Sequence, residues 1–94
     1  MLYLIVAFDG TDAGAPARRA AARPSHLEEA RPRNEQGRLP FGGAILSEAG
    51  AMIGSAIVIE AADEAEARAY VENDPYTKGG VWVKYEVWPF KRAF

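Results

Sequence analysis

The sequence predicts an α+β fold with the element order β-α-β-β-α-β, in which a four-stranded antiparallel sheet carries two helices on one face. Three observations lead to this prediction. The chain opens with an apolar run of β-forming residues at 2–8, which is typical of a strand. Two stretches rich in Ala and Glu, one long and one short, have a composition that favours helix. Three further segments have strand character and are separated by turns that contain glycine: 38–47, 52–60 and 81–88.

The size and composition of the chain limit the classes of protein it can be. Its 94 residues are enough for one domain, which we expect to span residues 1–94. A hydrophobic content of 49% supports a packed core. The net charge of −2 is not that of a nucleic-acid-binding domain, which is usually strongly basic. Because the chain has no cysteine, disulfides, thiolate nucleophiles and cysteine metal sites are excluded.

The first strand, residues 2–8, is apolar on both faces. Such a strand needs cover on both sides of its sheet, and two helices can cover only one side. We therefore expect the other side to meet a second copy of the chain, as in a homodimer. The same run is too short to span a membrane and lacks the basic start of a signal peptide. We expect no membrane partner and a cytoplasmic location.

The long Ala- and Arg-rich stretch predicts a first helix between Ala13 and about Gln36. Pro24 and Pro32 interrupt it, so the helix is expected either to kink or to break at one or both prolines. Gly37 offers a C-terminal stop.

The second and third strands, residues 38–47 and 52–60, are predicted to form a hairpin through the turn Glu48-Ala49-Gly50. Gly42 and Gly43 are poor strand formers. They indicate a bulge, or a place where another group approaches the backbone closely.

The short helix is predicted to begin at Asp63, because Glu66 follows three residues later as in a capping box, and to end near Glu72. Ala65 and Ala69 are expected to face the sheet.

The last strand, Val81 to Trp88, alternates two faces and is expected to end at Pro89. One face would carry Trp82 and Trp88 with two charged residues between them. The full order of elements is that of the split βαβ, or ferredoxin-like, arrangement.

His26 is the only histidine, and histidine readily gains or loses a proton near neutral pH. If residues 18–30 are helical, Arg19 and His26 share a face and Arg23 lies one turn before His26. One interpretation is a site in which Arg23, and secondarily Arg19, holds an anionic group while His26 moves a proton. The other is a surface helix whose histidine has no role.

Asp74, Tyr76 and Trp82 also allow two interpretations each. Asp74 before a proline is a common turn former, and Tyr76 can be a packing residue. Trp82 can line a ligand cavity or belong to a face that meets a second subunit, where aromatic residues are enriched. Phe41-Gly42-Gly43-Ala44 lacks the spacing and the lysine of a phosphate loop. One histidine with scattered carboxylates is a poor set of ligands for zinc or iron, so we expect no metal, and we also expect no cofactor.

Taken together, these segments resemble the YciI-like family (YCII-related domain) along nearly the whole chain. The run Arg23-Pro24-Ser25-His26-Leu27 matches the family's Arg-x-x-His-Leu pattern. The other segments that carry the resemblance are Gly42-Gly43-Ala44-Ile45-Leu46, Gly54, Glu60-Ala61, Glu66-Ala67, Asn73-Asp74-Pro75-Tyr76, Gly79-Gly80-Val81-Trp82 and Trp88-Pro89-Phe90. A second proline and extra charge at Glu28–Arg33 depart from the usual pattern, which bears on the length of the first helix.

The resemblance implies a ferredoxin-like domain that pairs into a dimeric α/β barrel, and an active site built around His26 and Asp74. One member of the family is similar to a lyase that removes hydrogen chloride from a chlorinated hydroxyquinol. Fold and motif do not fix the substrate.

Two hypotheses follow. In the first, the chain is a small acid–base enzyme of the lyase or isomerase type that acts on an anionic, aromatic metabolite. Asp74 would support His26 as the proton carrier, and Arg23, Gly43, Tyr76 and Trp82 would bind the substrate. In the second, the chain is a non-catalytic binding or regulatory dimer that uses the same pocket. Both hypotheses assign the same residues to the pocket. They differ in whether the bound compound is converted to a product.

Overall fold

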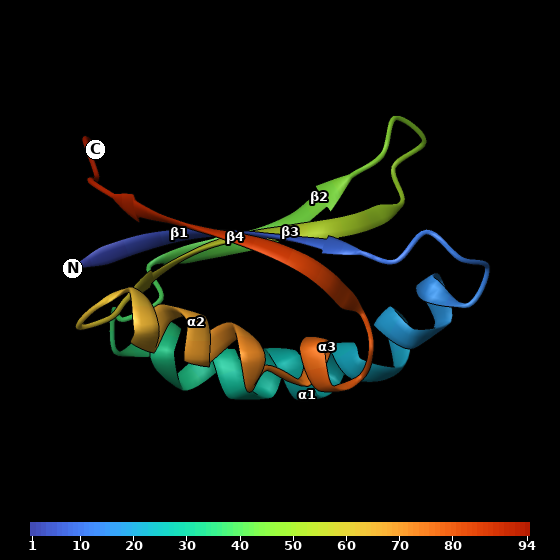
Figure 1. Cartoon of the computed structure of the whole chain (residues 1–94), viewed down its shortest axis with the longest axis horizontal. Helices are drawn as coiled ribbons and strands as arrows, with labels where there is room; N and C mark the ends of the chain where they lie inside the picture. The colour runs from blue at the N-terminus through green and yellow to red at the C-terminus, as the bar shows by residue number, and fades with distance from the viewer.

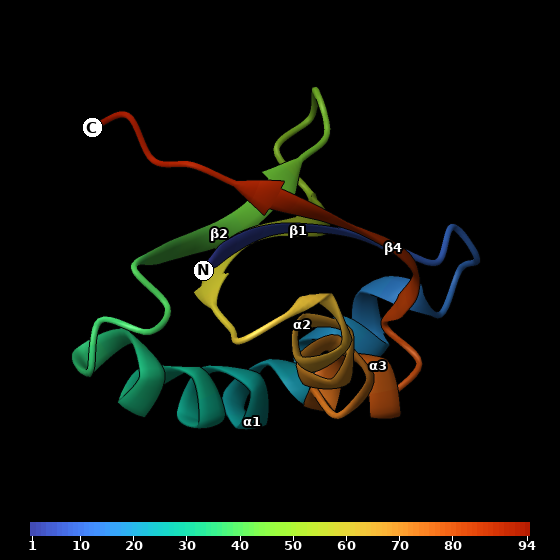
Figure 2. The same cartoon turned by 60° about the vertical axis from the view of Figure 1, so that its left-hand side comes forward.

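The computed structural model describes residues 1–94 and contains four strands and three helices. In chain order they are β1 (Leu2–Asp9), α1 (Ala15–Glu35), β2 (Phe41–Leu46), β3 (Met52–Glu60), α2 (Glu64–Glu72), α3 (Pro75–Lys78) and β4 (Trp82–Phe90). The strands form one sheet in the order β2-β3-β1-β4, with every neighbouring pair antiparallel. Figures 1 and 2 show all three helices on the same face of this sheet. The predicted ferredoxin-like α+β fold is confirmed.

The core lies between the sheet and the helices. Strand β1 is central, and its alternate residues Tyr3, Ile5, Ala7 and Asp9 are buried on the helix side. The other residues of β1 face away from the helices and are only half-buried. Period-two alternation therefore divides an almost wholly apolar strand into a core face and an outer face that has no layer over it (Figure 2).

Helix α1 runs without interruption from Ala15 to Glu35 and contains both Pro24 and Pro32. The predicted alternative of a break at one or both prolines is therefore wrong. Each proline removes one backbone N–H from the helical ladder. The loss is tolerated because the helix is anchored by buried side chains along one side, among them Arg19 and His26. Gly37, just past the end of the helix, has a φ of +76°, as expected for the predicted C-terminal stop.

The hairpin of β2 and β3 forms as predicted, with Gly50 at a φ of +87° in its turn. Strand β3 has the predicted bounds. Strand β2 is shorter than predicted, because it spans Phe41–Leu46 and leaves residues 38–40 and Ser47 outside the strand.

Helix α2 begins as predicted, since the Asp63 side chain accepts a hydrogen bond from the backbone N–H of Glu66 at 2.8 Å. Its buried residues are Ala67 and Val71, so the prediction that Ala65 and Ala69 face the sheet is wrong. Val71 is the one branched apolar residue of the helix, and its burial determines which side faces inward. None of the helices is long and apolar enough to cross a membrane.

Strand β4 corrects two predictions. It continues through Pro89 to Phe90, and Trp82 does not share a face with Trp88. Phe8 pairs with Lys84 whereas Asp9 pairs with Trp82, so β4 has one extra residue opposite this step. This β-bulge reverses the alternation. Trp82 is therefore buried on the helix side at 5% exposure, whereas Trp88 lies on the outer face at 56%.

Candidate functional site

His26 and Asp74, which are 48 residues apart in the sequence, meet beneath the sheet. His26 comes from the middle of α1, and Asp74 is the N-cap of α3. His26 Nδ1 lies 2.9 Å from Asp74 Oδ1 and 3.0 Å from Oδ2. The two side chains are only 10% and 2% exposed. Asp74 also accepts a hydrogen bond from the backbone N–H of Tyr76 at 2.8 Å, so the cap of α3 fixes its position.

This arrangement sets the roles of the two imidazole nitrogens. A carboxylate oxygen only accepts hydrogen bonds, so Nδ1 carries the proton and donates to Asp74. In the neutral ring, Nε2 is then the acceptor. Nε2 makes no hydrogen bond within the protein, and it is not among the enclosed polar atoms without a partner, which are Arg19 Nε and Tyr70 Oη. His26 therefore offers a fixed basic nitrogen that another molecule can reach.

Two aromatic rings hold the imidazole. The Tyr76 ring stacks on it with a centroid distance of 4.1 Å and an angle of 20° between the planes. The Trp82 ring meets it edge-on at 5.6 Å and 76°. Burial raises the pKa of Tyr76, and the nearby Arg19 and Arg23 guanidinium groups partly oppose this shift. Tyr76 is thus a neutral wall of the site at physiological pH.

A second buried polar group lies beside this pair. The Arg19 guanidinium donates from Nη1 to both carboxylate oxygens of Asp9 at 2.9 and 3.0 Å, and from Nη2 to Ser55 Oγ at 3.1 Å. Trp82 Nε1 donates to the same Ser55 oxygen at 3.2 Å. The guanidinium carbon lies 4.7 Å from the centre of the Tyr76 ring. Arg19 therefore links the end of β1 to β3 and to the aromatic wall of the site.

A cavity of about 120 Å³ opens in front of His26. It is lined by Arg19, Arg23, His26, Leu27, Ala30, Leu39, Gly42, Gly43, Ala44, Ser55, Ile57 and Tyr76. Arg23 is exposed and forms no ion pair or side-chain hydrogen bond, so its charge is free. Gly43 contributes backbone, and Trp82 is not part of the lining. Of the six residues predicted for the site, four line the cavity, while Asp74 and Trp82 contact His26 without lining the cavity.

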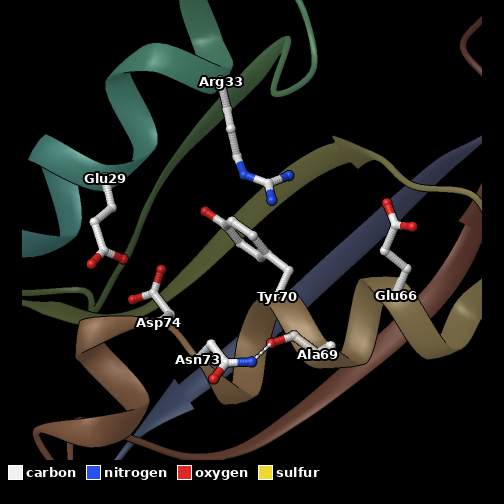
Figure 3. Close-up of a pocket in the computed structure, with 7 residues that line it drawn as sticks. All are labelled: Glu29, Arg33, Glu66, Ala69, Tyr70, Asn73 and Asp74. Atoms are coloured by element: carbon white, nitrogen blue, oxygen red, sulfur yellow. Dashed lines mark hydrogen bonds between the residues drawn. The ribbon is translucent and has the colours of Figure 1, made fainter.

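A larger space of about 280 Å³ lies on the other side of Asp74, between α1 and α2 (Figure 3). Glu29 and Arg33 reach it from α1, and Tyr70 lies across from them on α2. Burial raises the pKa of Tyr70 to about 12, and the negative charge of Asp74 acts in the same direction. The Nε2 atom of His26 is not directed here, because His26 does not line this space. No group of three or more His, Asp or Glu side chains converges anywhere to hold a metal ion.

The family model for the YCII-related domain matches residues 1–91. The chain belongs to this YCII family. Protein YciI of Escherichia coli O6:H1 is 33% identical over an alignment of 100 positions that covers all of both chains. Fusaric acid biosynthesis protein 2 of Gibberella fujikuroi is 33% identical over 97 positions, which cover 95% of this chain and 91% of that one.

Several solved structures are similar to this YCII-family chain along nearly its full length, among them one that contains a bound ligand. It is 5-chloro-2-hydroxyhydroquinone dehydrochlorinase (TftG) of Burkholderia phenoliruptrix AC1100, in complex with 2,5-dihydroxybenzoquinone. The two chains superpose with a TM-score of 0.86 at 30% identity, and the match covers 99% of this chain and 96% of TftG.

Sequence reasoning missed Asp9 and Ser55, and it placed Arg19 second to Arg23. A signal for Ser55 was present. Ser55 alternates with Ile57 and Ile59 on the inward face of β3, and a polar residue at such a position must find a partner or serve a ligand. Asp9 is likewise the inward residue that follows Ala7 on β1. In this YCII-family chain the inward polar residues of the sheet mark the site as clearly as the histidine does.

Proposed function

We propose that this chain is a small acid–base enzyme of the lyase or isomerase type, in which His26 moves a proton and Asp74 orients it. The observation that carries the proposal is the hydrogen bond from Nδ1 to Asp74, which leaves Nε2 as an acceptor on the wall of a cavity. A general base must lie within hydrogen-bond reach of the proton it removes. A ligand in this cavity meets that requirement, because His26 is part of the lining.

In the proposed mechanism, Nε2 takes a proton from a ring hydroxyl or an activated carbon of the substrate. Asp74 stabilises the imidazolium that forms, and the stacked Tyr76 ring keeps the imidazole in place. For an isomerase, the imidazolium returns the proton to another atom. For a lyase, the electron pair released by the proton expels an anionic leaving group. Positioned proton transfer of this kind contributes about 10²–10⁴-fold in rate.

The cavity favours a small ring compound with negative charge. Its volume of about 120 Å³ is of the order of an engineered core cavity of about 150 Å³ that holds a benzene ring. Arg23, whose charge is unpaired, would bind an anionic oxygen at the rim, and Gly43 would border the ligand with its backbone in β2. The relation to a dehydrochlorinase whose structure contains a dihydroxybenzoquinone supports hydroxylated six-membered rings as the substrate class. The proposed chemistry uses only side chains of the protein and needs no cofactor.

The chain is also proposed to act as a homodimer through the outer face of its sheet. Phe41, Val58, Leu4 and Trp88 pair in one row across all four strands on that face. Phe41 and Trp88 are about half exposed in the single chain. Val58 is buried between its neighbours, whereas Phe41 and Trp88 expose large apolar side chains on one face, and exposed apolar patches of this kind mark interaction surfaces. Pairing of two such faces would give the dimeric α/β barrel.

The test of the catalytic proposal is turnover of a panel of small phenols, hydroxyquinols and their chlorinated forms in D₂O. NMR would detect deuterium uptake and loss of the leaving group. His26→Asn is expected to reduce turnover at least 100-fold. Asp74→Asn is expected to reduce it too while the fold is kept, because Asn is also a good N-cap for α3. Ser25→Ala, an exposed neighbour of His26 on α1, is the matched control and should be unchanged.

The same panel decides between the enzyme and the alternative of a binding or regulatory dimer. If wild-type protein binds some of these compounds but turns over none, the enzyme proposal is wrong. His26 and Asp74 would then serve ligand binding alone.

A further inference from the structure

We propose that Ser55 donates a hydrogen bond to the ligand and selects ring compounds that carry an oxygen acceptor. This inference rests on the proposed function, since it assigns the second polar contact of the same cavity. Ser55 lies on the inward face of β3, is 3% exposed and is one of the residues that line the cavity.

The hydrogen bonds already made by Ser55 determine what its hydroxyl can still do. A serine hydroxyl has two acceptor lone pairs and one O–H donor. Arg19 Nη2 and Trp82 Nε1 both approach Ser55 Oγ, at 3.1 and 3.2 Å. Guanidinium and indole N–H groups are donors only. Both lone pairs are therefore occupied, and the only remaining capacity of this buried hydroxyl is to donate its own proton.

No acceptor within the protein takes that proton. The carboxylate of Asp9, which shares Arg19 with Ser55, forms its bonds with Nη1 of the guanidinium and none with the serine. The residues that pair with Ser55 across the sheet are Ala7 and Ala44. Their methyl groups offer no acceptor and leave the hydroxyl open to the cavity. A buried donor without a partner is costly, so a ligand oxygen at this point would be stabilising.

Arg19 makes this donor stronger. The serine oxygen accepts from a charged guanidinium, which polarises the O–H bond and strengthens the hydrogen bond that it donates. The charge of Arg19 is itself balanced by Asp9. Arg19 is thus a positioning residue that orients and polarises Ser55, whereas the unpaired cation at the cavity is Arg23.

The cavity consequently offers two directed polar groups from different elements: an acceptor at His26 Nε2 on α1 and a donor at Ser55 on β3. A matching ligand carries a proton donor, such as a ring hydroxyl, at one position and a carbonyl or phenolate oxygen at another. Hydroxyquinones and hydroxylated aromatic carbonyl compounds have this pattern. Simple phenols and alkylphenols lack the second group.

The experiment compares the three isomeric hydroxybenzaldehydes with the three matching methylphenols by calorimetric titration. The three isomers sample different spacings between the hydroxyl group and the acceptor. Wild-type protein is expected to bind at least one aldehyde roughly 3- to 10-fold more tightly than its methylphenol, the effect of one hydrogen bond. Ser55→Ala should bring this ratio close to 1. Ser55→Cys, with a similar size and a weak donor, should give an intermediate ratio, and Ser25→Ala should keep the wild-type ratio.

The outcomes separate the two proposals. If wild-type protein shows no preference, or if Ser55→Ala or Ser55→Cys keeps the full preference, the role of Ser55 is wrong while the cavity remains the binding site. A purely structural serine would weaken both ligand classes equally and leave the ratio unchanged, which also overturns the inference. If no compound binds to wild-type protein, the proposed ligand class is wrong, and the role of Ser55 is refuted with it.

Discussion

The buried ion pair between Arg19 and Asp9 gives the sharpest prediction for stability. Its two side chains are only 7% and 5% exposed, and the guanidinium also holds Ser55. Replacing Arg19 by Met keeps most of the side-chain volume but removes the charge. The carboxylate of Asp9 would then be left in the core without its partner.

The magnitude follows from that burial. Breaking a buried pair by removing one partner costs about 3–5 kcal/mol, because the remaining charge is uncompensated. Domains of this size have a total free energy of unfolding of about 5–15 kcal/mol. The Arg19→Met variant should therefore lose a large part of its stability. The thermal midpoint is expected to fall by about 12 °C or more.

The assay is urea unfolding at one fixed protein concentration, because self-association would add to the apparent stability. Arg18→Met is the matched control on the same helix. Arg18 pairs with Asp12 on the surface, so the Arg18→Met substitution should hardly change the urea concentration at the unfolding midpoint. The double variant Asp9→Asn with Arg19→Met should lose much less than the sum of the two single losses. A loss below about 1 kcal/mol for Arg19→Met, or additive losses in the cycle, would refute the reasoning from an uncompensated buried charge.

Three further predictions test other parts of the molecule. A Cβ on Gly42 would lie 2.4 Å from Ile57 Cγ2, whereas one on Gly43 meets no atom within 4 Å. Gly42→Ala should therefore destabilise by about 1–3 kcal/mol and Gly43→Ala by less than about 0.5 kcal/mol in the same urea assay; equal losses would contradict this. Because burial raises the pKa of Tyr70 to about 12 from 10.0, the unfolded chain ionises first as pH rises. About 3 kcal/mol of stability should thus be lost between pH 10 and 12. Tyr70→Phe should lose less over this window, and an identical pH profile for the two proteins would be the contrary result. Light scattering should give twice the 10.2 kDa chain mass for wild-type protein and a monomer for Trp88→Glu, whereas a wild-type monomer at micromolar concentration would contradict the dimer.

Most of the fold was predictable because its signals are local. The composition of β1, the glycine turn at Gly50 and the cap at Asp63 each depend on residues within a few positions of one another. The continuity of α1 through its prolines was not predictable, because tertiary packing decides whether a helix survives the loss of a backbone hydrogen bond. The bulge in β4 could not be predicted from the sequence for a similar reason. A register shift is a property of two paired strands and leaves no mark in one of them.

The site was predictable only in part. Local sequence left His26 and Asp74 unrelated, and the family resemblance alone joined them. The structure brings their side chains to 2.9 Å. Ser55 and Asp9 carry no sequence motif. Their importance comes from the buried hydrogen bonds that they form with Arg19, and these depend on the final position of Arg19.

The bulge in β4 has a consequence for how this chain can change. One extra residue in β4 reverses the alternation of its side chains between the two faces. Trp82 therefore faces the histidine, and Trp88 faces the proposed partner. Deletion of Val83 would remove the extra residue and restore a strict alternation along β4. Either Trp82 would leave the histidine, or the outward residues from Lys84 onward would turn into the core. Any length change at this point therefore alters both faces of the sheet together. The spacing between the two tryptophans, rather than their identity alone, therefore links the face that carries the histidine to the outer face of the sheet.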